Sequence, residues 1–242
     1  MTTTIKIFQT VEELAQYFVS LLTLRIRETP DNHDFSWMLS GGNTPKVIFN
    51  EIASTSGNTI NWNRILVFWG DERCVSPDSH DSNYKMAREN LLDHVPIPCS
   101  NIFRIRGEAP PEFESDRYAE QFRQHVKTFE GSPQTDFLML GVGEDGHTAS
   151  IFPANLHLFG SNKLFELSEH PETKQNRITA TGKIINHAKT VVIIATGEGK
   201  ALKVAQILNH STGCDTLSAA LVHPENGEVV WLLDRKAASL LA

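Results

Sequence analysis

Residues 35–45 read Phe-Ser-Trp-Met-Leu-Ser-Gly-Gly-Asn-Thr-Pro, a largely apolar run that stops at a glycine turn. The run Phe35–Leu39 predicts a strand, and the two glycines that follow it predict a tight turn. Thr44 is suited to cap a helix, and Pro45 is suited to its first position, where no backbone N–H is needed. The segment therefore predicts a strand, a turn and a helix in direct succession.

The same order of apolar run and glycine-containing polar turn returns three more times. The repeats are Ile65–Trp69 before Gly70–Arg73, Phe137–Leu140 before Gly141–His147, and Val191–Ala195 before Thr196–Lys200. Apolar runs of this length are typical of strands covered on both faces, and helices between them supply the crossovers that a parallel sheet needs. We therefore expect an α/β fold, doubly wound, with a mostly parallel sheet and helices on both faces.

Further elements extend this pattern in both directions. Thr10 and Glu13 have the spacing of a capping box in front of a helix, and a late strand is expected over 228–233. The periodicity predicts further helices at 83–93, 115–129 and 199–209, the second with Phe129 on its apolar side. No linker or tandem repeat divides the chain, so we expect one domain over residues 1–242.

The composition restricts the possible partners. The 242 residues include 22 Lys+Arg and 29 Asp+Glu, a net charge of −7, with 40% hydrophobic residues and no basic cluster. This charge disfavours nucleic acid and anionic membranes, whereas a few donors in a cleft suffice to hold a small anionic metabolite. Cys74, Cys99 and Cys214 have the odd number and wide spacing of free thiols in a reducing compartment, and neither a leader nor a membrane-spanning run is visible. We expect a cytoplasmic monomer.

Polar clusters follow all four expected strands, at the edge where open α/β sheets bind their ligands. Glycine, aspartate and asparagine also form ordinary turns, but four such clusters at one edge favour a binding site. The first cluster, Ser40-Gly41-Gly42-Asn43-Thr44, combines close backbone approach, free helix N–H groups and hydroxyls, which suits a phosphate. It lacks P-loop spacing, which disfavours hydrolysis of a nucleoside triphosphate.

The third cluster, Gly141-Val-Gly-Glu-Asp-Gly146, matches the spacing of the dinucleotide-binding fingerprint. Its acidic residues would repel a pyrophosphate, and Pro153 interrupts any helix that follows, so we do not interpret it as a dinucleotide site. His147 comes directly after this loop and beside Asp145. Most histidines are surface or structural residues, but an imidazole at a strand end next to a carboxylate suits a general base near neutral pH.

Cationic residues at the other strand ends extend this candidate site. A short charged run such as the one from Asp71 to Arg73 is often a solvated turn, but this one follows a buried strand. The guanidinium of Arg73 offers a planar fork for a phosphate or for charge on a carbonyl oxygen, and Arg177 and Lys200 would add to a cationic clamp. The sequence contains no metal-ligand spacing and no G-x-S-x-G pattern, so we expect no metal, and a hydrolase would activate water directly.

Five spaced motifs together resemble the glucosamine-6-phosphate isomerase/6-phosphogluconolactonase family, and its lactonases in particular. The motifs are Ser40-Gly-Gly-Asn-Thr-Pro45, Trp69-Gly-Asp-Glu-Arg73, Asp81-Ser-Asn-Tyr84, Gly141-Val-Gly-Glu-Asp-Gly-His-Thr-Ala-Ser150 and Thr196-Gly-Glu-Gly-Lys-Ala201. The resemblance covers nearly the whole chain and implies a sugar-phosphate isomerase/deaminase-like fold. It also implies hydrolysis of 6-phospho-D-glucono-1,5-lactone to 6-phospho-D-gluconate in the oxidative pentose phosphate pathway, with no cofactor and no obligatory metal.

The resemblance implies a role for each candidate residue. His147 would be the general base for the attacking water, Asp145 its electrostatic partner, and Arg73 the active-site arginine. The substrate and its phosphate would be held by Ser40, Gly41, Gly42, Asn43, Thr44, Asp71, Arg177 and Lys200. The donors to the oxyanion stay open between Arg73 and backbone N–H groups. One departure is Thr216-Leu217-Ser218, where relatives commonly have a Leu-Pro pair.

Two alternatives stay open at this point. Glucosamine-6-phosphate deaminases and isomerases share the Ser-Gly-Gly and Asp-Gly-His elements but typically have Asp-Glu-Tyr where Arg73 closes the triplet here. They also have an acidic residue shortly after Asp-Gly-His, where this chain has Ile151-Phe-Pro153. A non-catalytic sugar-phosphate sensor domain would bind 6-phosphogluconate and leave the decay of the lactone unchanged.

Overall fold

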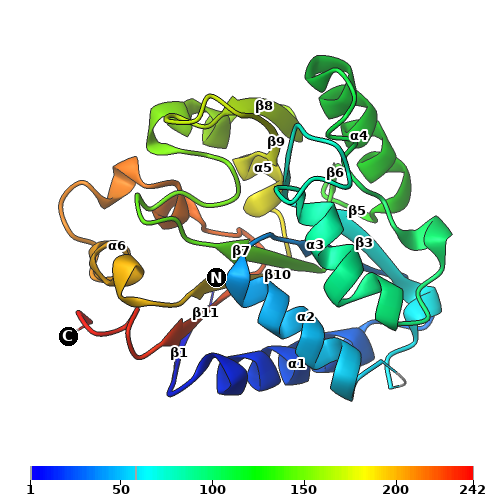
Figure 1. The fold of residues 1–242 in the computed structure, drawn as a ribbon, viewed down its shortest axis with the longest axis horizontal. Coiled ribbons are helices and arrows are strands. Elements are labelled where there is room, and N and C mark those ends of the chain that lie inside the picture. Colours follow the sequence, from blue (N-terminus) through cyan, green and yellow to red (C-terminus); the bar gives the residue numbers. More distant parts are fainter. Residues whose placement is uncertain (1, 58, 242) are drawn as a thin grey trace.

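The computed structural model describes residues 2–57 and 59–241, and its centre is a six-stranded sheet in which all neighbouring strands are parallel (Figure 1). Across the sheet the strands are β1 (Thr2–Phe8), β11 (Glu228–Asp234), β10 (Thr190–Ala195), β7 (Phe137–Gly141), β2 (Phe35–Leu39) and β3 (Ile65–Trp69). The four predicted apolar runs form the adjacent strands β10, β7, β2 and β3, and the predicted late strand is β11. Strand β1 forms one edge of the sheet, and it was not predicted because neither of its faces is exclusively apolar.

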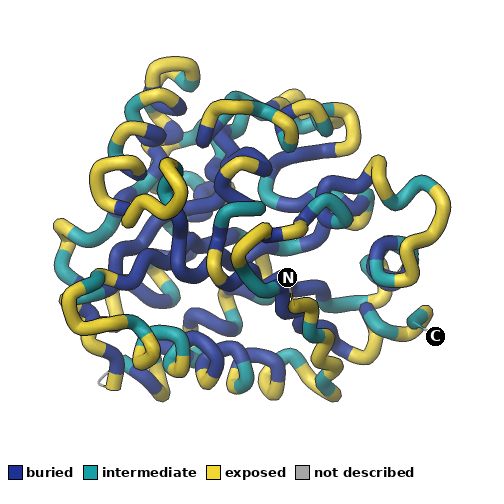
Figure 2. The backbone as a smooth tube through the Cα atoms, turned by 180° about the vertical axis from the view of Figure 1, so that it is seen from behind, coloured by how far each residue is buried: buried dark blue, intermediate teal, exposed yellow. Residues whose placement is uncertain are grey.

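Helices cover both sides of this sheet, which confirms the doubly wound α/β prediction. The α-helices are α1 (Val11–Glu28), α2 (Asn43–Thr55), α3 (Asn83–Asn90), α4 (Pro111–His125), α5 (Gly182–Ile185) and α6 (Ala201–Leu208). Figure 1 shows α1 and α2 side by side along one face, with α4 and α5 beyond the other face. Strands β2, β3 and β10 are buried along their whole length, and Figure 2 shows this buried centre with exposed turns around it.

Shorter elements complete the fold. A second sheet, antiparallel and in the order β4-β9-β8, consists of β4 (Asp71–Arg73), β9 (Asn176–Ala180) and β8 (Phe165–Glu169). A small hairpin pairs β5 (Thr128–Phe129) with β6 (Ser132–Pro133). The 3-10 helices are η1 (Trp62–Arg64), η2 (Leu92–His94), η3 (Cys99–Asn101), η4 (Pro153–Gly160), η5 (Glu198–Lys200), η6 (Cys214–Thr216) and η7 (Ser218–Leu221). Neither antiparallel sheet was expected, because their strands are short and lack an apolar run.

The start of α1 confirms the predicted cap at Thr10, but the return bond of Glu13 reaches the residue before the cap, where a standard capping box would use the cap itself. The Glu13 N–H donates to Thr10 Oγ1 over 3.2 Å, and Glu13 Oε2 accepts from the N–H of Gln9 over 3.0 Å. The start of α2 differs from the prediction, because α2 already begins at Asn43 behind Gly42. Gly42 has φ of +115°, a conformation that favours glycine, so Thr44 lies inside the first turn and is not the cap.

The predicted boundaries of three other helices also need correction. The helix expected over 115–129 is α4, which begins at Pro111 and ends at His125. Phe129 lies in the β5–β6 hairpin with 42% of its surface exposed, because Glu130 and Gly131 adopt positive φ and turn the chain back there. Helix α3 ends at Asn90, ahead of η2, and α6 begins at Ala201, after η5.

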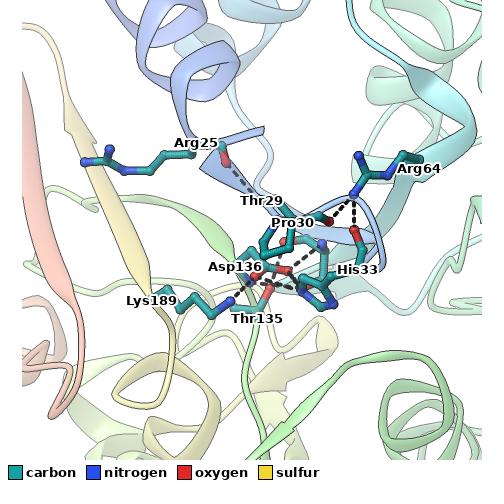
Figure 3. A network of polar contacts seen from close by, with 9 residues as sticks. Arg25, Thr29, Pro30, His33, Arg64, Thr135, Asp136 and Lys189 are labelled. Atoms are coloured by element: carbon teal, nitrogen blue, oxygen red, sulfur yellow. Dashed lines mark hydrogen bonds and ion pairs between the residues drawn. The ribbon is translucent and has the colours of Figure 1, made fainter. Parts of the chain in front are cut away.

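A polar network lies at the amino ends of the central strands (Figure 3). The carboxylate of Asp136, directly before β7, accepts hydrogen bonds from the backbone N–H of Ser36 over 2.9 Å and from its hydroxyl over 2.7 Å. Lys189 Nζ lies 2.6 Å from Asp136 Oδ1, and His33 Nε2 lies 3.1 Å from Oδ2. The network therefore joins the starts of β2, β7 and β10 through one buried carboxylate.

Candidate active site

The loops at the carboxyl ends of the strands surround a cavity of about 300 Å³. Eight of the residues predicted from the sequence line it, namely Ser40, Gly41, Gly42, Asp71, Arg73, His147, Arg177 and Lys200. Asn43 and Thr44 instead line an adjoining cavity of about 270 Å³, to which Gly41, Gly42 and Lys200 also contribute. Asp145 lines neither cavity but contacts His147. The sheet topology thus brings together side chains that lie up to 160 positions apart, between residues 40 and 200.

The imidazole of His147 is held by Asp145 from within the same loop. Nδ1 of the ring lies 2.6 Å from Asp145 Oδ1, which also accepts from the backbone N–H of His147 over 3.1 Å. An ionised carboxylate only accepts hydrogen bonds, so this contact places the ring proton on Nδ1. Nε2 is then the basic nitrogen, and within residues 2–57 and 59–241 it has no hydrogen-bond partner.

The charge state of Asp145 agrees with this arrangement. Partial burial opposes ionisation of the carboxyl, but the hydrogen bond and the charge of His147 outweigh it and lower the pKa of Asp145 to about 2. The carboxylate therefore stays ionised at every pH at which the imidazole can act as a base. This fixes the tautomer of the ring and stabilises the imidazolium that forms when Nε2 takes a proton.

Two neighbours restrict the position of this ring. Phe152 is buried, and its ring centroid lies 4.5 Å from that of His147. On another side the backbone of Gly143 comes so close that an added Cβ would lie 2.1 Å from Nδ1. Only glycine allows this approach, and the Gly143 N–H donates to the carbonyl of His147 over 2.8 Å. Phe152 comes from the Ile151-Phe-Pro153 segment, to which the sequence had assigned no structural role.

Arg73 and Arg177 lie next to each other because β4 and β9 pair in antiparallel register at these two residues. The Nε atom of each is buried and has no hydrogen-bond partner in the described part of the chain. Arg73 donates through Nη1 to the carbonyl of Asp81, and Arg177 donates through Nη2 to Gln175 Oε1 over 3.2 Å. Burial, followed by the charge of Arg73, lowers the pKa of Arg177. Two adjacent cations that line one cavity form a site suited to an anion.

The glycine loop after β2 is shaped by Asn83, which the sequence analysis quoted in a motif but gave no role. The Asn83 side chain occupies the space beside Gly41, where an added Cβ would lie 1.8 Å from its Oδ1. Asn83 is itself fixed, because Nδ2 donates to the Asp71 carbonyl over 3.0 Å. The Asp71 carboxylate accepts from Ser150 Oγ over 2.6 Å, so it is already engaged within the protein although it lines the cavity.

Glu72 is a further residue that sequence reasoning missed. Its side chain is buried, and its carboxylate accepts from the backbone N–H groups of Arg73, Asn83 and Tyr84 and from the hydroxyl of Ser82. Burial raises the pKa of Glu72, and these hydrogen bonds oppose the rise. This carboxylate joins β4 to the start of α3 and so positions both Arg73 and Asn83. In the sequence, Glu72 is only the middle residue of the charged triplet Asp71-Glu72-Arg73, and this gives no sign of its contacts with α3.

Residues 2–57 and 59–241 contain neither a metal-ligand cluster nor a membrane-spanning helix. No group of three or more His, Cys, Asp or Glu side chains is arranged to hold a metal ion. None of the helices described there has both the length and the apolar character that crossing a bilayer requires. The cavity brings the imidazole of His147 together with the cationic side chains of Arg73, Arg177 and Lys200.

Comparison with known proteins shows the family to which this chain is similar. Residues 9–231 match the family described as glucosamine-6-phosphate isomerases/6-phosphogluconolactonase. The 6-phosphogluconolactonase of Aggregatibacter actinomycetemcomitans is 40% identical over 96% of this chain and 95% of its own, and that of Haemophilus influenzae is 38% identical over the same shares. The solved structure of Trypanosoma brucei 6-phosphogluconolactonase superposes with a TM-score of 0.90 at 30% identity and covers 100% of this chain and 99% of its own.

Proposed function

Because this chain belongs to the glucosamine-6-phosphate isomerase/6-phosphogluconolactonase family, we propose that it hydrolyses 6-phospho-D-glucono-1,5-lactone to 6-phospho-D-gluconate in the oxidative pentose phosphate pathway. The observation that carries the proposal is the imidazole of His147, held by Asp145 through Nδ1 and without a partner at Nε2 in the described residues, in the lining of the same cavity as the arginine pair. This arrangement supports the proposal, which needs a base for water and a receptor for an anionic substrate in the same cavity.

His147 activates the attacking water. Nε2 removes a proton as the water oxygen bonds to C1 of the lactone, and the carbonyl oxygen becomes an oxyanion. The tetrahedral intermediate then collapses, the bond from C1 to the ring oxygen breaks, and the imidazolium returns its proton to that oxygen. The carboxylic acid so formed loses a proton to solvent, so that one lactone and one water give one carboxylate and one proton. Asp145 holds the imidazole throughout and stabilises its charged form.

The cationic residues bind and orient the substrate. Arg177, Lys200 and the loop from Ser40 to Thr44 hold the 6-phosphate, which anchors the ring so that C1 lies against the water and the base. Arg73 pairs in register with Arg177 and lines the same cavity, and we assign it the role of the active-site arginine that the family resemblance implies. Its guanidinium and the backbone N–H groups of the glycine loops are the available donors to the oxyanion.

The residues after His147 favour a lactonase over a deaminase. Opening a sugar ring and moving a carbon-bound proton requires an additional acid and base, whereas hydrolysis starts from a closed ring and needs activated water. In this chain, Ile151 and Phe152 are both buried, and Phe152 packs against the imidazole. An apolar contact there supplies no proton.

One assay tests the proposal directly. Freshly prepared 6-phosphogluconolactone releases acid as it hydrolyses, and this release is followed with and without the protein. We expect an acceleration that disappears in His147→Ala while binding of 6-phosphogluconate is kept. Binding of 6-phosphogluconate with lactone decay at the uncatalysed rate would instead identify a sensor, and release of ammonia from glucosamine 6-phosphate would identify a deaminase. The monomeric state, the single domain, the cytoplasmic location and the lack of nucleic-acid binding stay predictions.

A further inference from the structure

Residues 217–219 contact the loop of His147 on both sides of the histidine. Leu217 lies directly before η7, and Ser218 and Ala219 are the first two residues of η7. Before the histidine, the Ala219 N–H donates to the carbonyl of Gly146 over 3.3 Å. Leu217 packs against the same glycine, where an added Cβ would lie 2.9 Å from Leu217 Cδ2. Gly146 has φ of +87°, so the backbone entering His147 is both in a glycine conformation and covered by Leu217.

After the histidine, the hydroxyl of Ser218 joins the two ends of a tight turn. It accepts from the N–H of Thr148 over 2.9 Å and donates to the carbonyl of Ile151 over 2.6 Å. The same two residues are joined directly by the N–H of Ile151, which donates to the Thr148 carbonyl over 3.0 Å. Ser218 is fully buried, so water does not compete for these bonds, and it lines neither cavity of the site.

The turn that Ser218 closes is conformationally strained. Ala149 within it has φ of +50°, a left-handed conformation that is unfavourable for a residue with a Cβ. Such a residue persists only where its surroundings over-determine the backbone. Ala149 lines the catalytic cavity two residues after His147, so a relaxation of this turn would be transmitted to the imidazole.

We propose that Ser218 is a positioning residue for His147, which holds the imidazole loop in place from outside the cavity; this rests on the lactonase function proposed above. Removing the hydroxyl leaves the Thr148 N–H and the Ile151 carbonyl buried with one partner fewer each. The loop then relaxes and the base moves relative to the bound lactone. Substrate binding is unaffected, because the arginine pair and the glycine loop make no hydrogen bond to Ser218 within the described residues.

A matched control exists at the opposite end of the sheet. Ser36 is also buried, and its hydroxyl likewise accepts from a backbone N–H over 2.9 Å, that of Asp136, and donates to an oxygen over 2.7 Å. Ser218→Ala and Ser36→Ala therefore remove the same kind of doubly bonded hydroxyl. Both variants lose stability, but only the first change lies beside the proposed base.

The test compares kinetics and an imidazole signal in these two variants. We expect Ser218→Ala to lose about 10–100-fold in kcat with KM changed less than twofold, since a displacement of about 1 Å is enough for such a loss. The downfield Nδ1–H proton resonance expected for the 2.6 Å contact to Asp145, assigned by its absence in His147→Gln, should shift or broaden in Ser218→Ala. Ser36→Ala should keep wild-type kcat and this resonance.

Wild-type kcat together with an unchanged resonance in Ser218→Ala would overturn the proposal, and so would an equal loss of kcat in Ser36→Ala. If Ser218→Ala does not fold, Ser218→Cys keeps the volume with a weaker donor, and it must lose kcat at least severalfold. The resonance reads the position of His147 without any turnover. A wild-type protein that leaves lactone decay unchanged would therefore refute the proposed function and still leave the position of His147 measurable.

Discussion

Strand β7 has an aspartate–histidine pair at each of its ends, and the two pairs are built differently. Before the strand, the Asp136 carboxylate is 3% exposed (Figure 3). It accepts from the backbone N–H and the hydroxyl of Ser36, from Lys189 and from His33. After the strand, the Asp145 side chain is 42% exposed, and its partner in the described structure is His147. The same two residue types therefore form a saturated network at one end and an incomplete one at the other.

The difference shows where the molecule uses its polar groups for folding and where it keeps them for a ligand. At the amino end the carboxylate joins three strands and its hydrogen-bonding capacity is used. At the carboxyl end the Nε2 of His147 and the Nε atoms of Arg73 and Arg177 have no partner among residues 2–57 and 59–241. Polar groups without partners are costly for stability, and three of them belong to residues that line one cavity, which is typical of a functional site.

The largest expected effect comes from removing the two histidines in turn. His147→Ala should lose about 10²–10⁴-fold in kcat, because the general base is gone, with only a small change in melting temperature. His33→Ala should leave kcat unchanged and lower the melting temperature, because its imidazole contacts only the structural carboxylate of Asp136 in the described residues. Steady-state kinetics and thermal unfolding of both variants provide the measurement. A comparable loss of kcat in His33→Ala would mean that the two ends are coupled.

Substitution of the two aspartates should differ in which property it lowers most, the stability of the fold or the activity. Asp136→Asn weakens a buried carboxylate that accepts from four donor groups of three residues, and we expect it to cost about 2–3 kcal/mol of unfolding free energy with unchanged kcat. Asp145→Asn should cost less than about 1 kcal/mol, because its carboxylate is partly exposed, but it should lower kcat by disturbing the tautomer of His147. Urea denaturation measures both losses. Equal losses of stability would contradict the distinction between the two ends.

Cations at the two ends offer a smaller and more specific contrast. Arg177→Gln or Lys200→Gln should raise KM about tenfold and lower kcat less, because each contributes to holding the phosphate in the proposed site. Lys189→Gln is the matched control at the amino end, where its ammonium pairs with Asp136. It should leave KM at the wild-type value. An unchanged KM in both site variants would remove the proposed phosphate clamp.

The sequence was sufficient for the features that follow from local patterns. Four central strands, β2, β3, β7 and β10, are largely apolar runs with a glycine within two residues of their last apolar residue, and this predicted the parallel sheet, its two helical layers and the edge at which the cavity lies. The cap of α1 was equally local, since Thr10 and Glu13 are three residues apart. The roles of His147, Arg73 and the phosphate-binding residues remain predictions that the experiments above test.

The features that escaped prediction depend on pairing across long distances. The register of Arg73 with Arg177 arises from an antiparallel sheet whose strands are too short to show a pattern. The contact of Asn83 with Gly41 and the bonds of Ser218 to Thr148 and Ile151 join segments 42 and about 70 residues apart. The error at Phe129 was of another kind, because an apolar residue continued the helical period past the point where the chain turns back.

The smallest expected effect is the pH dependence of the Asp145 contribution. A carboxyl whose pKa is lowered to about 2 in the folded protein, against about 3.9 in the unfolded chain, stabilises the fold above the unfolded value. That contribution decreases as the pH falls from about 4 to about 2. Because solvent screens this partly exposed pair, it amounts to less than about 1 kcal/mol. The difference in unfolding free energy between wild type and Asp145→Asn, measured by urea denaturation, should therefore narrow across this window. A difference that stays constant from pH 6 to pH 2 would show that Asp145 holds His147 without relying on its charge.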